Sequence, residues 1–552
     1  MNRKRSGGQV LVDTLKTQGV EMAFCVPGES YLDVLDALHD SPIKLITCRQ
    51  EGGAAYMAEA YGKLTGKPGI CFVTRGPGAT NASIGVHTAF QDSTPMILFI
   101  GQVARDQVER EAFQEVDFRR MYGPLCKWVA EIDDASRIPE LVSQAFHRAL
   151  NGRPGPVVLA LPEDMLTDLV ETADAGPYKI ARGAPSSQQM SELQKLLSEA
   201  KRPFLILGGG GWDDKAVSDI SDFALNFDLP VGCAFRCQDL YDNTAANYAG
   251  DVGIGINPKL AQHIKESDLL IVVGARLGEM TTSGYSLIDI PCPLQKLVHI
   301  HASAEELGRV YQAHLPINSG MAQFAREAAL LPKPAGSSWQ ERTKQTHQDY
   351  ADWIQTPIIP GPLQMGIIME YLRKTLPKDA ILTNGAGNYA TWSHRFYQYR
   401  HFRTQLGPTN GSMGYGVPAA IAAKLAQPHR IVVSFNGDGC FLMNGQELAT
   451  AIQYGANVIF LVIDNGMYGT IRMHQERHYP GRVSGTDLRN PDFAALARAY
   501  GLEAFRIEKT ADFAPAFAQA LEARKPALLH LLLDPEAITP KQSLSEIRAM
   551  AK

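Results

Sequence analysis

Residues 431–439 read IVVSFNGDG, and residues 458–469 read VIFLVIDNGMYG. Each stretch is a short apolar run that ends in glycine, aspartate and asparagine, a pattern typical of a buried strand followed by a turn. Asp464 follows Gly439 by 25 residues, which leaves room for one crossover helix, predicted at 444–454, between two parallel strands. The sequence therefore predicts an α/β fold in which both turns lie at the same edge of one sheet.

The same alternation of apolar strands and amphipathic helices extends along the whole chain. Besides the two strands above, the stretches that we expect to form strands are 23–26, 44–47, 70–74, 96–100, 157–160, 204–207, 269–273, 297–300, 380–383 and 527–533. Two segments rich in glycine, proline and serine, 175–189 and 332–338, are predicted to be linkers. We therefore predict three doubly wound α/β domains with parallel sheets, at residues 1–178, 190–331 and 361–540.

The composition argues against several classes of protein. The chain has 552 residues, of which 45% are hydrophobic, and a formal net charge of −5. Without a basic excess, binding to nucleic acid or to an anionic membrane surface is not expected. No apolar stretch has the length of a signal peptide or a membrane span, and the eight cysteines form neither a disulfide framework nor a paired zinc motif. We therefore expect a soluble, cytoplasmic protein.

The two turns quoted first contain oxygen ligands and glycines that permit close approach. Mg²⁺ prefers oxygen ligands and shares its coordination sphere with phosphates. Asp438, the side chain of Asn465 and the backbone carbonyl at Met467 would supply three oxygens. Gly437 and Gly439 would let backbone amides approach a phosphate. Ordinary turns also favour these residue types and would explain either segment alone. Both together, one crossover apart, predict a site for a diphosphate and a magnesium ion.

This pair of turns resembles the signature of the thiamine-diphosphate-dependent enzymes, in which a GDG turn is followed by two asparagines. This chain has Asp464-Asn465 instead, and the second position is the one that supplies the metal ligand in the family. The resemblance covers nearly the whole chain and implies that thiamine diphosphate and Mg²⁺ are the cofactors. The residues it assigns to the cofactor are Glu51, Gln114, Gly387, Asn388, Gly411, Met413, Gly437, Asp438, Gly439, Asn465, Met467 and Tyr468, and those it assigns to the metal are Asp438, Asn465 and Met467.

A glutamate lies near the start of a predicted helix in residues 48–55, CRQEGGAA. The helix dipole favours a carboxylate at such a place, and that alone would account for Glu51. Together with residues 65–69, TGKPG, and 74–81, TRGPGATN, the segment resembles the N-terminal domain of acetolactate synthases and related 2-oxo-acid enzymes. The resemblance implies that Glu51 is the catalytic residue, which hydrogen-bonds the pyrimidine ring and so promotes removal of the thiazolium C2 proton.

A third match lies in residues 409–420, TNGSMGYGVPAA. In the family, a large apolar residue of this loop supports the cofactor in a bent shape, and Met413 stands at that place. Methionine is flexible enough to fill such a gap, although a methionine in an ordinary core is the alternative explanation. Upstream, Gly387 and Asn388 fall where the family contacts the diphosphate or the pyrimidine ring.

Within the family, the motifs look most like those of acetolactate synthases. Residues 112–115, AFQE, resemble a segment that lines their active site, and residues 274–277, GARL, resemble their GAR motif. In those synthases the arginine helps to hold the carboxylate of the second 2-oxo acid, a role that suits a guanidinium group. For Arg276, a surface ion pair is the alternative. The residues that we expect near the substrate are Glu29, Arg75, Phe113, Arg276 and His474.

Several positions depart from the synthase pattern. Glu29 replaces a glycine, Arg75 replaces a serine, and His474 stands at the place of a tryptophan that favours a larger second substrate. The first two changes would bring charge close to the substrate. The central domain has GIGIN at 253–257, where flavin-containing relatives have a GMHG sequence beside the flavin. This difference argues against a bound FAD.

We predict decarboxylation of a 2-oxo acid, with pyruvate as the expected donor, and transfer of the acyl-anion equivalent to a second carbonyl compound. The adjacent paired histidines of pyruvate decarboxylases are absent from the sequence, which disfavours that type of decarboxylase. Because the glutamate and the metal turns of the family serve one cofactor from two subunits, we expect a homodimer or homotetramer with active sites between subunits.

Three alternatives stay open. The same cofactor also serves 2-oxo-acid decarboxylases, acyl-CoA decarboxylases and aldehyde lyases, which differ in their substrate pockets. A second alternative is a cofactor-binding protein without turnover. The third is a nicotinamide-dependent oxidoreductase, which predicts a GxGxxG turn that residues 385–390, GAGNYA, do not complete.

Overall fold

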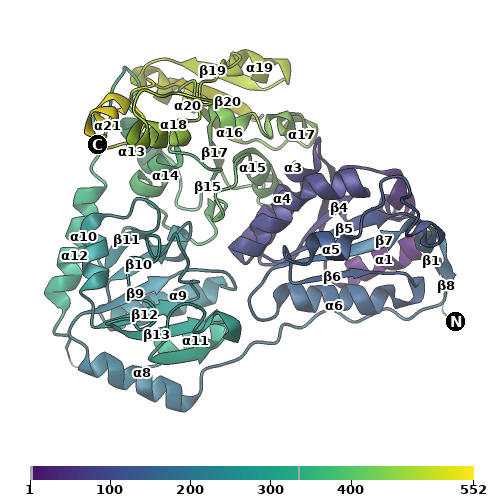
Figure 1. The fold of residues 1–552 in the computed structure, drawn as a ribbon, viewed down its shortest axis with the longest axis horizontal. Helices are drawn as coiled ribbons and strands as arrows, with labels where there is room; N and C mark the ends of the chain where they lie inside the picture. Colours follow the sequence, from purple (N-terminus) through teal and green to yellow (C-terminus); the bar gives the residue numbers. More distant parts are fainter. Residues whose placement is uncertain (1–3, 334–335, 552) are drawn as a thin grey trace. The chain divides into compact units, whose positions relative to one another are not determined.

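The computed structural model describes residues 4–333 and 336–551 (Figure 1). Residues 334–335 of the predicted second linker and residues 1–3 of the predicted first domain lie outside the described residues. The chain divides into two compact units. The first unit contains the residues up to Ala181 with Gly414–Pro428 and Leu442–Asn457, and the second contains Arg182–Met413, His429–Phe441 and the residues from Val458 onward. Two segments of the predicted third domain therefore belong to the first unit.

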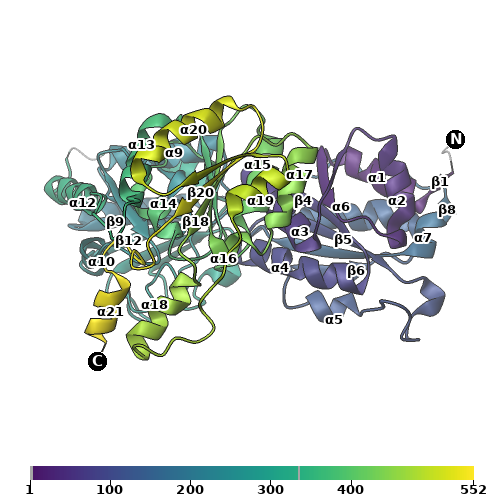
Figure 2. The ribbon, with the colours of Figure 1, turned by 90° about the horizontal axis from the view of Figure 1, so that it is seen from above.

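A six-stranded parallel sheet forms the centre of the N-terminal domain, in the strand order β3-β2-β4-β5-β7-β6. Its strands are β2 (Met22–Cys25), β3 (Lys44–Thr47), β4 (Gly69–Val73), β5 (Met96–Gln102), β6 (Trp128–Glu131) and β7 (Pro156–Pro162). The helices around it are α1 (Gly7–Thr17), α2 (Leu32–His39), α3 (Glu51–Thr65), α4 (Gly76–Asp92), α5 (Phe118–Tyr122), α6 (Ile138–Leu150) and α7 (Glu163–Thr167) (Figure 2). Strands β4, β5 and β7 are buried along their whole length, as expected for a parallel sheet with helices on both faces.

The C-terminal domain contains a second six-stranded parallel sheet, in the order β16-β15-β17-β18-β20-β19. Its strands are β15 (Ile381–Asn384), β16 (Gln405–Leu406), β17 (Val432–Gly437), β18 (Ile459–Asp464), β19 (Glu503–Ile507) and β20 (Ala527–Leu532). Its helices in the second unit are α13 (Met365–Thr375), α14 (Ala390–Phe396), α16 (Asp438–Phe441), α18 (Gly469–His478), α19 (Phe493–Ala499), α20 (Phe513–Glu522) and α21 (Leu544–Met550). The two apolar stretches that were quoted first are thus adjacent parallel strands, β17 and β18.

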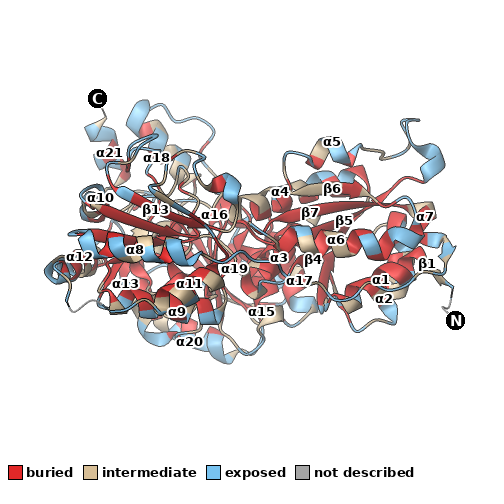
Figure 3. Cartoon of the chain, turned by 90° about the horizontal axis from the view of Figure 1, so that it is seen from below, coloured by how far each residue is buried: buried red, intermediate tan, exposed pale blue. Residues whose placement is uncertain are grey.

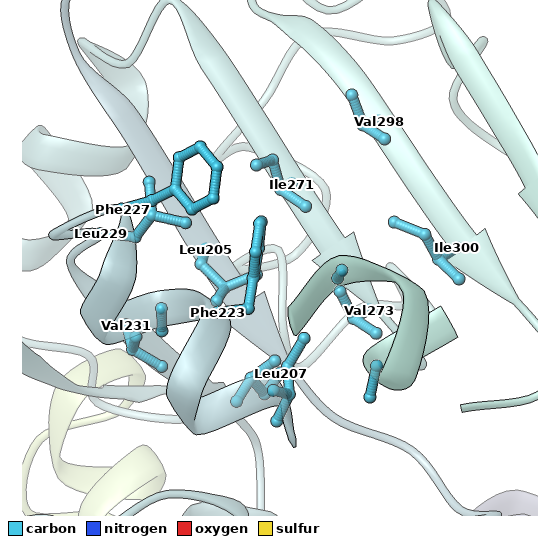
Figure 4. Close-up of a cluster of buried hydrophobic side chains, with 14 of the residues drawn as sticks. Leu205, Leu207, Phe223, Phe227, Leu229, Val231, Ile271, Val273, Val298 and Ile300 are labelled. Carbon is cyan, nitrogen blue, oxygen red and sulfur yellow. The ribbon is translucent and has the colours of Figure 1, made fainter. Parts of the chain in front are cut away.

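The central domain has a sheet of different strand order, β11-β10-β9-β12-β13-β14. Its strands are β9 (Pro203–Leu207), β10 (Val231–Ala234), β11 (Tyr248–Val252), β12 (Leu269–Val273), β13 (Lys296–His301) and β14 (Leu315–Asn318), and its helices are α8 (Ser187–Glu199), α9 (Asp214–Asn226), α10 (Pro258–Lys265), α11 (Met321–Ala329) and α12 (Gln340–Trp353). Figure 4 shows how Leu205 of β9 and Ile271 of β12 meet Phe223 of α9 in the apolar layer between sheet and helices.

The predicted α/β class with three doubly wound domains is confirmed, because each of the three domains has a six-stranded parallel sheet with flanking helices. The strands form a buried layer between helices whose outer faces are exposed (Figure 3). Helix α12 lies in residues 339–360, between the second predicted linker and the predicted third domain, where no element was predicted. No helix of the described chain is both long enough and apolar enough to cross a membrane.

The connection between β17 and β18 differs from the prediction. In place of one helix at 444–454, it contains a 3₁₀ turn, Gly445–Glu447, and the short helix α17 (Leu448–Gln453). The side chain of Asn444 donates a 3.0 Å hydrogen bond to the carbonyl of Gly414. The start of the expected helix is therefore a 3₁₀ turn, and Asn444 makes a contact with Gly414 of the same unit.

Helix α15 (Gly416–Ala426) also belongs to the first unit, where it packs against α3 (Figure 1). Just before α15, the hydroxyl of Tyr415 donates a 2.5 Å hydrogen bond to the fully buried carboxyl of Glu59 on α3. A bond to a buried carboxyl is costly to lose. Contacts between residues far apart in the sequence thus complete the core of this unit.

Candidate active site

The turns after β15, β17 and β18 meet around one cavity of about 240 Å³ in the second unit. The cavity lies at the carboxyl ends of these parallel strands, where open α/β sheets bind their ligands. The predicted cofactor and metal residues that line it are Gly387, Asn388, Gly411, Met413, Gly437, Asp438, Gly439, Asn465, Met467 and Tyr468. The structure therefore brings together all the predicted site residues of the C-terminal domain except His474.

Gly437 and Gly439 keep this cavity open. A β-carbon at residue 437 would lie 2.7 Å from the ring of Tyr389, and one at residue 439 would collide with the ring of Tyr468. The ring of Tyr389 is held in place by its hydroxyl group, which accepts a 3.1 Å hydrogen bond from the N–H of Gly385. Any larger residue at 437 or 439 would displace an aromatic side chain of the cavity wall, which explains why both positions are glycine.

Asp438 is buried at the first position of α16, close to the carboxyl group of Asp464. Its Oδ1 accepts a 2.9 Å hydrogen bond from the N–H of Gly439, and its Oδ2 accepts a 2.8 Å bond from the amide of Asn490. The same amide donates to Asp464 Oδ1 at 2.8 Å. Burial, together with the neighbouring Asp464, raises the pKa of Asp438 to about 6. A cation beside Asp438 would stabilise its ionised form.

Asp464 is the residue that departs from the asparagine pair of the family, and it does not line the cavity. Its Oδ2 lies 2.8 Å from His530 Nε2, and its Oδ1 accepts a hydrogen bond from Asn490. Burial opposes ionisation of Asp464, but the hydrogen bonds with His530 and Asn490 lower its pKa. The departure therefore leaves the cavity-lining ligand, Asn465, in place.

The oxygen atoms around the cavity fit a magnesium ion. Asp438 and Asn465 offer a carboxylate and an amide oxygen, and a β-bridge to Asp487 fixes the backbone at Met467. Among the residues that the structure describes, no group of three or more His, Cys, Asp or Glu side chains is placed to hold a metal by itself. An ion at this site would therefore take further ligands from a bound molecule, as Mg²⁺ does when it shares phosphate oxygens.

Asn388 makes its hydrogen bonds within the protein. Its backbone N–H donates to Thr470 Oγ1 at 2.9 Å, and its Oδ1 accepts from the same hydroxyl at 2.9 Å. Its amide also donates a 3.1 Å bond to the carbonyl of Ile538. Asn388 therefore joins the turn after β15 to the start of α18 and to the C-terminal segment, and so fixes the shape of the cavity wall.

Arg236 of the central domain is a buried residue that no sequence motif indicated. Its guanidinium donates hydrogen bonds to the carbonyls of Gly385, at 2.8 Å, and Pro408. These two residues begin the turns that contain Gly387 and Gly411, which line the cavity. Arg236 has a φ of +60°, and such a backbone costs on the order of 1 kcal/mol for a residue other than glycine. The backbone conformation and burial of Arg236 identify it as part of the site, because a single arginine in a loop leaves no pattern in the sequence.

Glu51 is the first residue of α3 and follows β3 after a short turn. The amide of Asn81 donates a 2.9 Å hydrogen bond to its Oε2, and its Oε1 lies close to the backbone of Gly78 in the first turn of α4. The residue is half-buried. Glu51 belongs to the first unit, whereas the cavity belongs to the second.

Arg75 and Glu29, the two charged residues that differ from the synthase pattern, form an ion pair. The guanidinium of Arg75 is buried; it binds Glu163 and lies 3.7 Å from Glu29 Oε1. Arg75, Glu29 and Glu163 follow β4, β2 and β7, so all three lie at the carboxyl edge of the N-terminal sheet. The sequence did not indicate Glu163, because a glutamate at the start of a short helix is common. The charge of Arg75 is thus balanced by two carboxylates.

Phe113 and Gln114 lie in the loop that follows β5. The side chain of Phe113 is 75% exposed, and Gln114 has a φ of +66°. The carbonyl of Gln114 accepts a 2.9 Å hydrogen bond from the N–H of Gly76. The loop therefore lies against the turn that contains Arg75.

Arg276 and His474 lie outside the cavity. Arg276 lines a separate cavity of about 60 Å³ in the central domain, with its Nε 3.5 Å from Glu306 Oε1. His474 is exposed on α18, and its ring stacks on that of His478 with 6.4 Å between centroids. Neither residue is therefore placed next to the predicted metal ligands in this structure.

Relatives of the chain match it over almost its full length. The acetolactate synthase large subunit of Corynebacterium glutamicum is 31% identical over 97% of this chain and 88% of its own length. That of Haemophilus influenzae is 32% identical, over 92% of this chain and 90% of its own length. The large subunit of acetolactate synthase isozyme 2 of Escherichia coli is 30% identical over 96% of each chain.

Family models match the three domains in turn. The N-terminal TPP binding domain of thiamine pyrophosphate enzymes matches residues 5–121, their central domain matches 190–328, and their C-terminal TPP binding domain matches 385–531. The glycine turns and the oxygen ligands of the cavity lie within the third match. The chain therefore belongs to the thiamine pyrophosphate enzymes, and thiamine diphosphate with Mg²⁺ is its cofactor set.

Proposed function

We propose that this protein is a carboligase of the acetolactate-synthase type. It decarboxylates a 2-oxo acid, with pyruvate as the expected donor, and joins the acyl unit to a second carbonyl compound. The observation that supports this most directly is the single cavity in which Asp438 and Asn465 lie together with the glycine turns and Met413. The acetolactate synthase large subunits among the relatives support the reaction class.

In this proposal, Asp438, the amide oxygen of Asn465 and the carbonyl of Met467 hold Mg²⁺, which neutralises the diphosphate. Thiamine diphosphate, when bound, supplies the carbon nucleophile for the donor carbonyl and accepts the electron pair left by carbon dioxide. The remaining residues that we assign to cofactor binding are Gln114, Gly387, Asn388, Gly411, Met413, Gly437, Gly439 and Tyr468. Among them, Met413 is a half-buried side chain in the cavity wall, where it would support a bent cofactor.

Glu51 is the proposed catalytic residue, because its carboxyl group would share a proton with the pyrimidine ring. The amide of Asn81, 2.9 Å from Oε2, orients this carboxyl group at the start of α3. Glu51→Gln is expected to lower kcat by about 100- to 10,000-fold, the usual contribution of a general acid–base group. Binding of the cofactor, measured by fluorescence quenching, should change little. Full activity of this variant would contradict the role of Glu51.

We assign the substrate end of the site to Glu29, Arg75, Phe113, Arg276 and His474. The strand order β3-β2-β4 supports the first two, because the turns with Glu51, Glu29 and Arg75 are neighbours at one sheet edge. For Arg276 and His474, the assignment rests only on the resemblance to acetolactate synthases.

One observation favours a second reaction on the same cofactor. Arg75 is already paired with Glu163 and Glu29, so its charge is balanced before any substrate carboxylate arrives. A decarboxylase, an acyl-CoA decarboxylase or an aldehyde lyase needs no site for the carboxylate of a second 2-oxo acid. Protonation in place of ligation would then end the reaction.

A product analysis distinguishes the two reactions. The purified protein is incubated with thiamine diphosphate, Mg²⁺ and a series of 2-oxo acids, with and without aldehyde acceptors. Carbon dioxide together with a coupled product supports the carboligase, whereas carbon dioxide with only the free aldehyde supports the decarboxylase. Lack of reaction with every 2-oxo acid would contradict the carboligase and favour an acyl-CoA or lyase substrate.

We further propose a cytoplasmic homodimer or homotetramer with active sites between subunits, and domain bounds of 1–178, 190–331 and 361–540. The proposed assembly rests on the family resemblance, in which the glutamate and the metal turns serve one cofactor from two subunits. Mixing inactive Glu51→Gln and Asp438→Asn subunits under exchange conditions should restore activity. Mixtures that stay inactive, despite subunit exchange seen by native mass spectrometry, would contradict shared sites.

A further inference from the structure

A buried glutamate outside the cavity contacts the turn that precedes Glu51. Glu447 has no exposed surface and lies in the segment Leu442–Asn457, which packs in the first unit. Its Oε1 accepts hydrogen bonds from the backbone N–H groups of Arg49 and Gln50, both at 3.0 Å. A side chain from the crossover between β17 and β18 therefore fixes the backbone at the start of the helix that begins with Glu51.

Residues that follow Glu447 in the chain reinforce its contact with the same turn. Thr450 donates a 2.5 Å hydrogen bond to Glu447 Oε2 and so orients the carboxylate. The guanidinium of Arg49 donates to Gln453 Oε1 at 2.5 Å. At the edge of the sheet, the hydroxyl of Tyr454 accepts a 2.8 Å bond from the N–H of Thr47. The C-terminal end of α17 is thereby joined to Thr47 and Arg49.

Gly53 makes room for this carboxylate. A β-carbon at residue 53 would lie 2.7 Å from Glu447 Oε1 and 3.1 Å from its carboxyl carbon. The N–H of Gly53 is bonded by the side chain of Gln50 at 3.1 Å, which completes the cap of α3. The second glycine of the EGG motif at 51–53 is thus explained by Glu447 and not by a turn, since residue 53 lies within the helix.

We propose that Glu447 is a positioning residue that holds Glu51 in its working geometry. This inference rests on the proposed role of Glu51 and adds a residue to it. Hydrogen bonds from N–H groups to a carboxylate are about twice as strong as neutral ones, and here they fix the two residues before Glu51. Without them the first turn of α3 is free to shift, and a shift of about 1 Å can slow a reaction about 100-fold.

Glu447 lies in the chain segment that connects the two turns of the predicted metal site. Glu447 lies nine residues after Asp438, in the crossover that starts at the GDG turn and ends at Asp464-Asn465. One continuous segment therefore contains both metal turns at its ends and the anchor of the catalytic glutamate in its middle.

The test measures the reactivity of the bound cofactor in the full-length protein loaded with thiamine diphosphate and Mg²⁺. The readout is the rate at which the C2 hydrogen of the bound cofactor exchanges with deuterium, followed by quenched NMR samples, together with the Kd of the cofactor. Glu447→Gln keeps the shape and one oxygen, and we expect exchange to slow about tenfold. Glu447→Ala removes both acceptors, and we expect a loss of about 100-fold. The Kd should stay within about twofold, the usual scatter for independent sites.

A double variant tests whether Glu447 acts through Glu51. If it does, Glu51→Gln with Glu447→Ala should exchange no more slowly than Glu51→Gln alone, since residues that act as a unit are not additive. Backbone hydrogen exchange at Arg49 and Gln50 should also become faster in Glu447→Ala, because their acceptor is gone. If Glu447→Ala does not fold, Glu447→Gln still decides the question by the same measurements.

Glu59→Gln is the matched control. Glu59 is another fully buried glutamate at a junction of α3 with the C-terminal part of the sequence, where it accepts bonds from Tyr415 and Thr94. Its variant should lose stability but keep the exchange rate within about twofold. If the Glu447 variants exchange at the parental rate while Glu51→Gln is slow, the inference is overturned and the proposed function stands. If Glu51→Gln itself exchanges at the parental rate, the proposed role of Glu51 fails first, and the inference fails with it.

Discussion

The N-terminal and C-terminal sheets have the same topology. With the strands of each sheet numbered in order along the chain, both are arranged 2-1-3-4-6-5, whereas the central sheet is arranged 3-2-1-4-5-6. In both of the first two, the turn after the third strand holds a charged residue beside glycine. That residue is Arg75 in the N-terminal sheet and Asp438 in the C-terminal sheet. The same place in the same topology therefore holds opposite charges.

The two sheet edges also differ in how their charges are balanced. Arg75 lies between two carboxylates, so that its edge is closed by internal ion pairs. The carboxyl group of Asp438 lies beside that of Asp464, and the side-chain amide of Asn490 donates a hydrogen bond to each. The comparison shows that topology determines where a site lies and that the residue after the third strand determines its chemistry. The C-terminal edge requires a cation, and the N-terminal edge already contains one.

The largest effect, on the affinity for the cofactor and metal, is expected from Asp438→Asn at the C-terminal edge. The variant removes a metal ligand, and the loss of affinity should exceed the about 10- to 100-fold typical of outer-shell partners of metal ligands. Isothermal titration with thiamine diphosphate and Mg²⁺ measures it, and EDTA should abolish the stabilising effect of the cofactor in the parent protein. The variant without cofactor should unfold at no lower temperature than the parent. Affinity within tenfold of the parent would refute the assignment of Asp438.

At the N-terminal edge, Arg75→Met leaves Glu29 and Glu163 without their cation. Because Arg75 is buried and its partners are partly exposed, we expect a loss of about 2 kcal/mol of stability, as for hydrogen bonds to charged groups. Urea unfolding measures the loss, and binding of thiamine diphosphate should change little.

Arg120→Met is the control for Arg75→Met. Arg120 is 89% exposed in its pair with Asp117, and exposed pairs contribute at most about 1 kcal/mol. An equal effect of the two variants would show that the charge balance at the N-terminal edge has no special importance.

Arg236→Met tests whether the central domain shapes the C-terminal edge. Arg236→Met loses two hydrogen bonds from a charged group, each worth about 1.5 kcal/mol or more, so we expect the Kd for thiamine diphosphate to rise at least about tenfold, with kcat nearly unchanged at saturation. Arg430→Met is the matched control, because Arg430 likewise joins two backbone carbonyls, those of Asp379 and Arg403, at the amino ends of the strands. If both variants weaken cofactor binding equally, Arg236 has no specific role at the cavity.

The smallest effect on stability is expected from a substitution in α18. This helix follows the fourth strand of the C-terminal sheet, where the N-terminal sheet has the loop of Phe113. Hydrogen bonds from Arg548, with help from Arg472, lower the pKa of Glu476 on α18 to about 2, from an ordinary value of 4.5. A depressed carboxyl pKa stabilises the fold above pH 4.5, and this stability is lost as the pH falls towards 2. Glu476→Gln should therefore cost about 1 kcal/mol at pH 7 and less at pH 3.5. Urea unfolding at both values checks this, and a cost independent of pH would exclude the ion pair as its source.

All inner strands except β10 could be predicted from the sequence, and most edge strands could not. Strands β17 and β18 are mainly apolar and almost fully buried because helices cover both of their faces. The edge strands β6, β14 and β19 are partly exposed, so polar residues interrupt their apolar pattern. Strand β10 is buried but short and contains a glycine. Strands were therefore missed where the apolar pattern in the sequence is short or interrupted.

The candidate site shows the same division. Asp438 and Asn465 could be predicted because each directly follows a strand, so that sequence and space coincide. Arg236 lies 149 residues from the carbonyl of Gly385, and Glu447 lies 397 residues from the N–H of Gln50. Contacts of this kind leave no local pattern, and only the folded chain reveals them.

The discontinuous first unit has a consequence for biosynthesis. Its hydrogen bonds join Glu59 to Tyr415 across 356 residues and Thr47 to Tyr454 across 407. During translation the N-terminal sheet leaves the ribosome first, long before the helices that complete its core exist. The face of α3 that packs against α15 in the finished protein therefore stays exposed until these later residues are made. We expect the nascent chain to expose this face until residue 457 has emerged, because a partly synthesised domain cannot bury it.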